Sequence, residues 1–218
     1  MLTDYDGQRI CGVSDHFGSA DCRWPIEQMT GVTVFASGHV GEVNLAEAAE
    51  LAIALWNGLS GLRLEMTTNP KTANIITRPF RLDGRGNILA QCQLPCGFVQ
   101  PSSQMLCDVD LAEAFVIAQN PPQGRIDIVR TLGHEYGHGW GCPHIGAGNL
   151  MGSTYSNSIW KPQDLDIVQL RSRYGQPVPA PTPTPTPVPP QDPVIGPRLE
   201  FVDADGRRWR LNGVWEQV

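Results

Sequence analysis

The sequence predicts a mixed α/β fold, because five short strand-like segments are interspersed with three helical segments along the chain. The strand-like segments alternate apolar and polar residues or are rich in β-branched residues. The helical segments carry apolar residues three or four positions apart and have recognisable caps or stops. A run of closely spaced prolines after residue 176 ends this pattern, since proline lacks a backbone donor. The chain therefore has one sizeable globular unit.

The strands and helices can be placed in order along the chain. Asn44 is the expected N-cap of the first helix, with Glu47 at the capping-box position. Ile126, Val129 and Leu132 form one face of the second helix. Strands are predicted at residues 31–36, 62–66, 74–77, 88–93 and 105–109, and helices at residues 45–56, 126–139 and 164–174.

The composition divides the chain into an N-terminal segment, a globular domain, a linker and a tail. We expect these at residues 1–20, 21–175, 176–197 and 198–218. The Pro/Thr-rich linker should be an extended polyproline-II spacer. The tail contains two hairpin-turn dipeptides, Asp-Gly and Asn-Gly, but is too short for a core of its own. It can dock to a surface or another protein, oligomerise, or be the stub of a longer module.

The charge balance excludes some classes of protein. The chain has 16 Lys and Arg against 22 Asp and Glu, a net charge of −6, and no basic block for a nucleic acid. No stretch approaches the ~20 consecutive apolar residues of a transmembrane helix. Residues 1–20 lack the basic-then-apolar pattern of a secretory signal, so we expect that none exists or that it lies upstream.

Three of the five histidines lie in one eleven-residue segment, HEYGHGWGCPH. His134 and His138 are four residues apart, so on a helix both can bind the same ion. Glu135 lies beside the ion without being required as a ligand. Gly141 can take a positive φ and end the helix, which lets His144 return as a third ligand. Three nitrogen ligands leave a fourth position for water, which is typical of a catalytic zinc site.

This spacing, followed by Met151, resembles the HExxHxxGxxH motif and methionine turn of the metzincins, a family of zinc endopeptidases. The resemblance implies a zincin fold, α/β (α+β), with a mixed twisted sheet of about five strands, three helices and an active-site cleft over the HExxH helix. It implies that His134, His138 and His144 bind one catalytic Zn²⁺. Glu135 would be the general base on a zinc-bound water.

Met151 would form an apolar floor beneath the zinc, a role close to that of an ordinary core methionine. Some metzincins use a tyrosine two residues after this methionine, where this chain has Ser153. We therefore assign Tyr155 no catalytic role.

Three further segments make the chain most similar to the matrixins, the matrix metalloproteinases. They are the apolar residues 126–133 before the histidine motif, the closing segment 163–175, and residues 82–90, which resemble the matrixin loop and edge strand. The resemblance implies that an extended polypeptide substrate binds along the edge strand at Leu89, Ala90 and Gln91. Its side-chain pocket would be lined by the second helix and residues 153–156.

Departures from the matrixin pattern concern the other metal sites. Gln91 and Asp108 stand where matrixins hold a structural zinc with histidines, so we expect no structural zinc. Asp83, Asp110 and Glu113 match a matrixin calcium site, and oxygen ligands suit Ca²⁺. The alternative is that these three residues are solvated surface acids.

The six cysteines leave two questions open. Cys11, in the segment RICGVSD, resembles the matrixin cysteine switch, whose thiolate binds the catalytic zinc and keeps a zymogen latent. The alternative is a Cys11–Cys22 disulfide. One bridge is also expected among Cys92, Cys96 and Cys107, since all three flank one predicted strand pair.

The sequence thus predicts a secreted or extracytoplasmic zinc metalloendopeptidase that cleaves extended polypeptides. Two alternatives belong to other classes. The first is a catalytically inert binding or surface protein on a metzincin-like fold. The second is a zinc hydrolase that acts on small substrates instead of peptides.

Overall fold

The computed structural model describes residues 22–96, 99–177, 200–211 and 215–217. The chain divides into two compact units, Met1–Val178 and Pro179–Val218. This division falls inside the predicted linker. Residues 178–197 of the linker, like the N-terminal segment with Cys11, lie outside the described residues.

The first unit is built on a five-stranded mixed sheet with the spatial order β4-β1-β5-β7-β6. Four strands run parallel, and β6 pairs antiparallel with β7 at one edge. Two short ladders, β2–β3 and β8–β9, lie outside this sheet. The strands are β1 Val32–Ala36, β2 His39–Val40, β3 Val43–Asn44, β4 Leu64–Met66, β5 Ile75–Phe80, β6 Ala90–Cys92, β7 Met105–Asp110, β8 Phe115–Val116 and β9 Ile126–Asp127.

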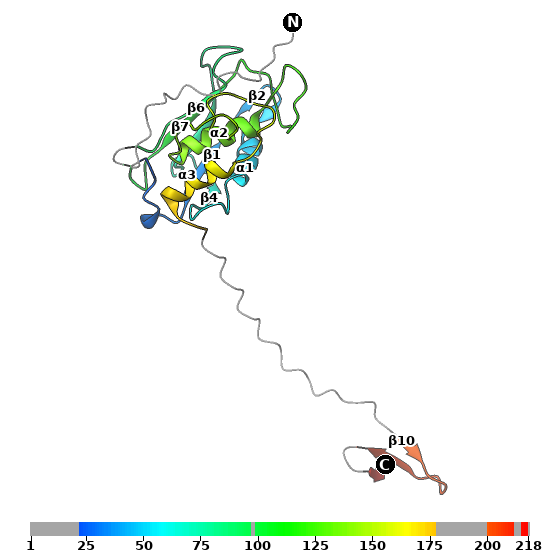
Figure 1. The fold of residues 1–218 in the computed structure, drawn as a ribbon. Helices are drawn as coiled ribbons and strands as arrows, with labels where there is room; N and C mark the ends of the chain where they lie inside the picture. Colours follow the sequence, from blue (N-terminus) through cyan, green and yellow to red (C-terminus); the bar gives the residue numbers. More distant parts are fainter. Residues whose placement is uncertain (1–21, 97–98, 178–199, 212–214, 218) are drawn as a thin grey trace. The chain divides into compact units, whose positions relative to one another are not determined.

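Three α-helices accompany the sheet, and α1 and α2 pack against each other and against it (Figure 1). The helices are α1 Leu45–Ala54, α2 Ile128–Gly139 and α3 Asp164–Tyr174, and a short 3-10 helix covers Ile26–Gln28. The mixed α/β class with a five-stranded sheet and three helices is confirmed. Among the described residues, no helix is long and apolar enough to cross a membrane.

Several predicted ends of helices and strands were wrong, because strand pairing or side-chain hydrogen bonds take up the backbone groups there. The second helix begins at Ile128 instead of residue 126, since Ile126 and Asp127 pair with β8 and the Asp127 carboxylate then caps the helix. The first helix ends two residues early, where Leu55 is its C-cap. The edge strand is shorter than residues 88–93, because the Ile88 N–H donates to the Asp83 carboxylate instead of joining the ladder.

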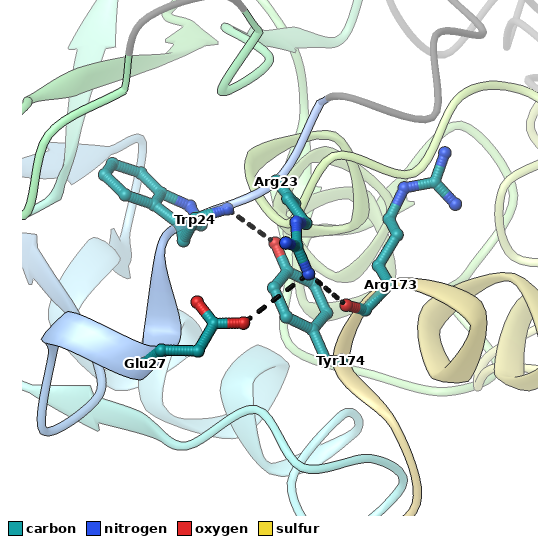
Figure 2. A network of polar contacts seen from close by, with 5 residues as sticks. All are labelled: Arg23, Trp24, Glu27, Arg173 and Tyr174. Atoms are coloured by element: carbon teal, nitrogen blue, oxygen red, sulfur yellow. Dashed lines mark hydrogen bonds and ion pairs between the residues drawn. The ribbon is translucent and has the colours of Figure 1, made fainter.

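A strap formed by residues 22–28 holds the C-terminal end of α2. The indole N–H of Trp24 donates to the Gly139 carbonyl over 2.8 Å, which satisfies a carbonyl left open at the helix end. The Tyr174 hydroxyl accepts from the Trp24 backbone N–H and donates to the Trp140 carbonyl, over 3.1 and 2.7 Å. Figure 2 shows the Tyr174 hydroxyl directed at the Trp24 backbone nitrogen and the Arg23 guanidinium reaching Glu27.

The disulfide pairing differs from both expectations. Cys22 is bonded to Cys96, so the Cys11–Cys22 alternative is wrong. Cys92 and Cys107 are free, so the bridge expected among the three cysteines near β6 is wrong too. The bridge joins the strap to the loop after β6, two segments 74 residues apart in sequence.

The second unit contains a three-stranded antiparallel sheet, formed by β10 Glu200–Val202, β11 Arg208–Leu211 and β12 Trp215–Gln217. The predicted Asp205-Gly206 turn is present, with Gly206 at φ +80° and its N–H bonded to the Asp203 carbonyl. The second predicted turn falls among residues 212–214, which are not described.

Tyr174→Phe should lower the free energy of unfolding by about 1–3 kcal/mol, because it removes the hydroxyl that serves two buried backbone groups. Arg23→Ala is the control, since an exposed ion pair contributes less than about 1 kcal/mol. Urea unfolding of both variants measures the difference. Equal losses would show that the Tyr174 hydroxyl does not hold the strap.

Candidate metal centre

Three histidines converge on one point. The candidate ligand atoms of His134, His138 and His144 all lie within 4.8 Å of one another. His134 and His138 are fully buried on α2, whereas His144 is half-buried, so the cluster reaches the surface on the His144 side. These residues can hold a metal ion.

Backbone carbonyls orient two of the rings. Nδ1 of His134 lies 2.7 Å from the Leu150 carbonyl, and Nδ1 of His138 lies 2.8 Å from the Cys142 carbonyl. A carbonyl oxygen only accepts, so each Nδ1 carries the proton and each Nε2 keeps its lone pair. Nε2 of His138 lies 3.2 Å from Nε2 of His144, and Nε2 of His134 is buried without a hydrogen-bond partner. A bound cation would supply that missing partner.

Burial keeps these rings neutral. Loss of solvation, followed by the neighbouring histidines, lowers the pKa of His134 well below its ordinary value. The same causes lower the pKa of His138 to about 3. Neutral imidazole is the form that binds metals, so both rings are in a ligand-ready state at neutral pH.

Three glycines allow α2 to enter the core. A Cβ at Gly133 would lie 2.9 Å from Leu55, the C-cap of α1, and one at Gly139 would lie 2.6 Å from Ile75 of the sheet. A Cβ at Gly137 would overlap the Met151 sulfur. Each glycine costs helix stability relative to alanine, about 1 kcal/mol. Close packing offsets that cost.

The return of His144 depends on the turn after α2. Gly141 has φ +90°, and a Cβ there would overlap the Cys22 carbonyl. The N–H of Cys142 then bonds to the Gly137 carbonyl, so the chain doubles back towards the helix. The predicted role of Gly141 is therefore confirmed, with the strap as a second constraint.

Asp166 is a residue that the sequence analysis missed. Its buried carboxylate accepts the N–H groups of Leu150 and Met151, over 2.8 and 3.0 Å, and that of Gln163 over 2.7 Å. It thereby fixes the turn whose Leu150 carbonyl orients His134. Met151 is fully buried against α2, as expected of an apolar floor. Asp166 at the third position of α3, a capping-box site, was the available sequence signal.

Glu135 is buried, and neither carboxylate oxygen has a hydrogen-bond partner of ordinary geometry. Burial raises its pKa well above the ordinary value, and the backbone N–H of Cys92 partly offsets the rise. Burial therefore favours the protonated form of this carboxyl group. It lies between the ligand helix and the edge strand.

The predicted substrate strand is an edge strand of the sheet. The Leu89 carbonyl accepts from Asp110, and the Gln93 N–H donates to Leu106. In this register Ala90 and Cys92 form non-hydrogen-bonded pairs, so their backbone groups point away from β7. Of the three predicted residues, Leu89 and Ala90 are buried and Gln91 is exposed.

The two positions tied to a structural zinc are neighbours, since Gln91 lies opposite Asp108. Asp108 is paired with Arg78 over 2.7 Å, and this pair also raises the pKa of Arg78. The Asp108 carboxylate is thus engaged by Arg78.

The three predicted calcium residues gather around the loop before β6. Asp110 accepts the N–H groups of Asp83 and Gly84, and Glu113 accepts that of Gly86. Asp110 and Glu113 are buried, so the solvated-surface alternative is wrong for these two. Calcium binding itself stays a prediction.

A cavity of about 440 Å³ lies beside the start of α2. Asp127, Val129 and Trp160 are among its lining residues, but residues 153–156 are not, unlike the predicted pocket. Tyr155 is buried instead, and its hydroxyl accepts from the Asp127 N–H while Arg130 stacks 4.1 Å over its ring. Tyr155 therefore contacts the start of α2.

The metal-free protein should lose stability as the pH falls from about 6.5 towards 3. In this pH window the histidines of the unfolded chain take up protons, whereas the buried His134 and His138 of the folded chain do not. Each ring therefore lowers the free energy of unfolding by up to about 1.4 kcal/mol per pH unit. Urea unfolding in chelator at several pH values measures the slope. His138→Gln should reduce the slope, whereas exposed His39→Gln should leave it unchanged; equal slopes for both would contradict the buried, neutral assignment.

Gly137→Ala should destabilise the protein by about 1–3 kcal/mol, because the added methyl displaces the Met151 side chain and outweighs the gain in helix propensity. Gly146→Ala is the control, since a Cβ there meets nothing within 4 Å. The urea midpoints of unfolding of the two variants, each compared with the wild type, measure the difference in stability. A neutral Gly137→Ala would mean that Met151 does not pack tightly under the helix.

Comparison with known proteins leaves the site to be interpreted from its own geometry. A scan against protein-family models and a search of curated proteins gave no match for this sequence. The observations that bear on function are therefore three converging imidazoles, two of them on a buried helix, a buried acid on the same helix, and an adjacent edge strand.

Proposed function

We propose that the protein is a zinc-dependent metalloendopeptidase of the metzincin type, similar to the matrixins. The observation that carries the proposal is the convergence of His134, His138 and His144, with the buried Glu135 next to His134 in the sequence of α2. Each of the steps below rests on contacts of these residues and of β6.

The donor set supports zinc as the ion. Imidazole nitrogens suit Zn²⁺, and a tetrahedral site with bonds of ~2.0–2.1 Å places its nitrogens roughly 3.3–3.4 Å apart. The 3.2 Å separation between His138 and His144 fits this geometry. A bound zinc ion would polarise the scissile carbonyl and make water acidic enough to attack at neutral pH.

Glu135 would carry the proton during the reaction. As carboxylate it accepts a proton from the attacking water, whose oxygen adds to the carbonyl carbon of the substrate. As neutral acid it gives that proton to the leaving amine when the carbon–nitrogen bond breaks. Its raised pKa supports the second half of this cycle, in which the neutral acid donates the proton.

The edge strand β6 supports an extended peptide as substrate. The backbone groups of Ala90 and the carbonyl of Cys92 point away from β7, so they are able to pair with an added strand. The Cys92 N–H also interacts with Glu135, which places the acid near such a strand. Main-chain pairing would therefore bring a peptide bond to the acid.

An extracytoplasmic location is part of the proposal. The Cys22–Cys96 disulfide supports it, because such bonds persist mainly in oxidising compartments.

Glu135→Gln should lower peptide cleavage by about 10²–10⁴-fold and leave one zinc ion bound, because it removes the proton carrier and none of the ligands. Cleavage of a peptide library and metal content are measured with and without chelator. Glu65→Gln, at an exposed position of β4, is the control.

The same assay separates the alternatives. A wild-type protein that binds zinc and cleaves no peptide would favour the inert binding protein. Hydrolysis of small amides or esters alone would favour the small-substrate hydrolase. Unchanged cleavage by Glu135→Gln would rule out its role as proton carrier.

A further inference from the structure

Two free thiols face each other beneath α2. Cys92 and Cys107 are directly opposite in the β6–β7 ladder, and both are buried. The flanking pairs Leu89–Asp110 and Gln93–Leu106 are hydrogen-bonded, so Cys92 and Cys107 form a non-hydrogen-bonded pair. In such pairs the Cα atoms are about 4.5 Å apart and the side chains are closest. That separation falls within the range that a disulfide spans.

The two sulfur atoms are in contact and closely surrounded. The side chains of Cys92 and Cys107 hydrogen-bond to each other, and the Thr77 hydroxyl interacts with Cys107 from the next strand. Cys92 Sγ lies only 3.2 Å from the position that a Cβ of Gly139 would occupy. Neither thiol therefore has room to rotate far from the other.

We propose that Cys92 and Cys107 are a redox-active dithiol, which an external small-molecule disulfide converts into a second intramolecular disulfide. The Cys92 thiolate, on the short edge strand, attacks the reagent and releases one thiol. Cys107 then attacks the mixed disulfide at Cys92 and releases the second thiol. Two protein thiols are oxidised, one reagent disulfide is reduced to two thiols, and the two protons pass to those thiols.

The edge position of β6 makes this step accessible. β6 spans three residues and pairs with β7 on one side only, so it opens more readily than the interior strands. In the closed fold, burial first and the neighbouring Cys92 second raise the pKa of Cys107 well above its ordinary value. Cys107 is thus kept as a neutral thiol until the strand opens.

The bridge would fasten the edge strand to the sheet beside Glu135, whichever reaction the site performs. Cys92 supplies the backbone N–H that interacts with Glu135, and its side chain lies against α2. Oxidation would therefore restrict the opening of β6 at this point. The inference does not depend on peptidase activity.

Disulfide mapping of the full chain tests the proposal. The protein is equilibrated in glutathione buffers from fully reduced to fully oxidised, both folded and after refolding in the same buffer. It is then quenched in acid, alkylated under denaturing conditions and digested. A peptide linked through Cys92 and Cys107 should increase with the oxidised fraction and disappear in excess reduced glutathione. The melting temperature should rise by about 5–10 °C on oxidation.

Cys142 and the existing bridge are internal controls. Cys142 is also buried and free, and it should be alkylated in every buffer. Formation of Cys22–Cys96 in the oxidised samples shows that the buffer is oxidising enough. Alkylation of both Cys92 and Cys107 in all those samples would overturn the proposal, as would linkage of either to Cys142.

Two variants separate the bridge from a general effect of oxidant. Cys107→Ser should abolish the linked peptide and leave only the smaller temperature shift that Cys22–Cys96 formation causes. Cys92→Ser should do the same if the first variant does not fold. Cys142→Ser should keep the linked peptide and the full temperature shift. A shift of equal size in the variants that lack one thiol of the pair would overturn the assignment.

Discussion

The burial of α2, in which every residue except Val129 is buried, is the constraint on which the rest of the structure depends. A helix that carries His134, Glu135 and His138 is surrounded by the sheet, α1 and the Met151 turn. Burying polar groups is unfavourable unless each finds a partner. Carbonyl groups satisfy one nitrogen of each ring, and the other nitrogens converge. The candidate metal centre and the structural core are therefore the same region here.

The surrounding elements are arranged to satisfy that helix. The strap provides Trp24 for the carbonyl at the end of α2, and Gly141 lets the chain turn back beside Cys22. Asp166 reaches from α3 to hold the turn that contains Met151. These contacts come from sequence positions far apart. Each one fixes a segment of backbone around α2, and none of them touches the three histidines. The proposed chemistry thus depends on positions well outside the histidine motif.

Prediction from the sequence succeeded where the signal was local. The helix that begins at residue 164 was predicted from its own residues. The placement of His134 and His138 on one helix face follows from their separation of four residues, about one turn. It failed where partners were distant. The second helix begins two residues later than predicted, because Ile126 and Asp127 pair with β8. The disulfide joins Cys22 to Cys96 across 74 positions. The role of Asp166 was missed for the same reason.

The sequence by itself determined the α/β class, the helix that carries two histidines, and the glycine that allows the third to return, because these follow from periodicity and backbone freedom. Tertiary structure alone decided which groups surround them. It brought the Cys92 amide to Glu135, paired Cys92 with Cys107 and set Asp108 against Arg78. Strand register and chain reversal join residues that no local pattern links, so these contacts exist only in the folded chain.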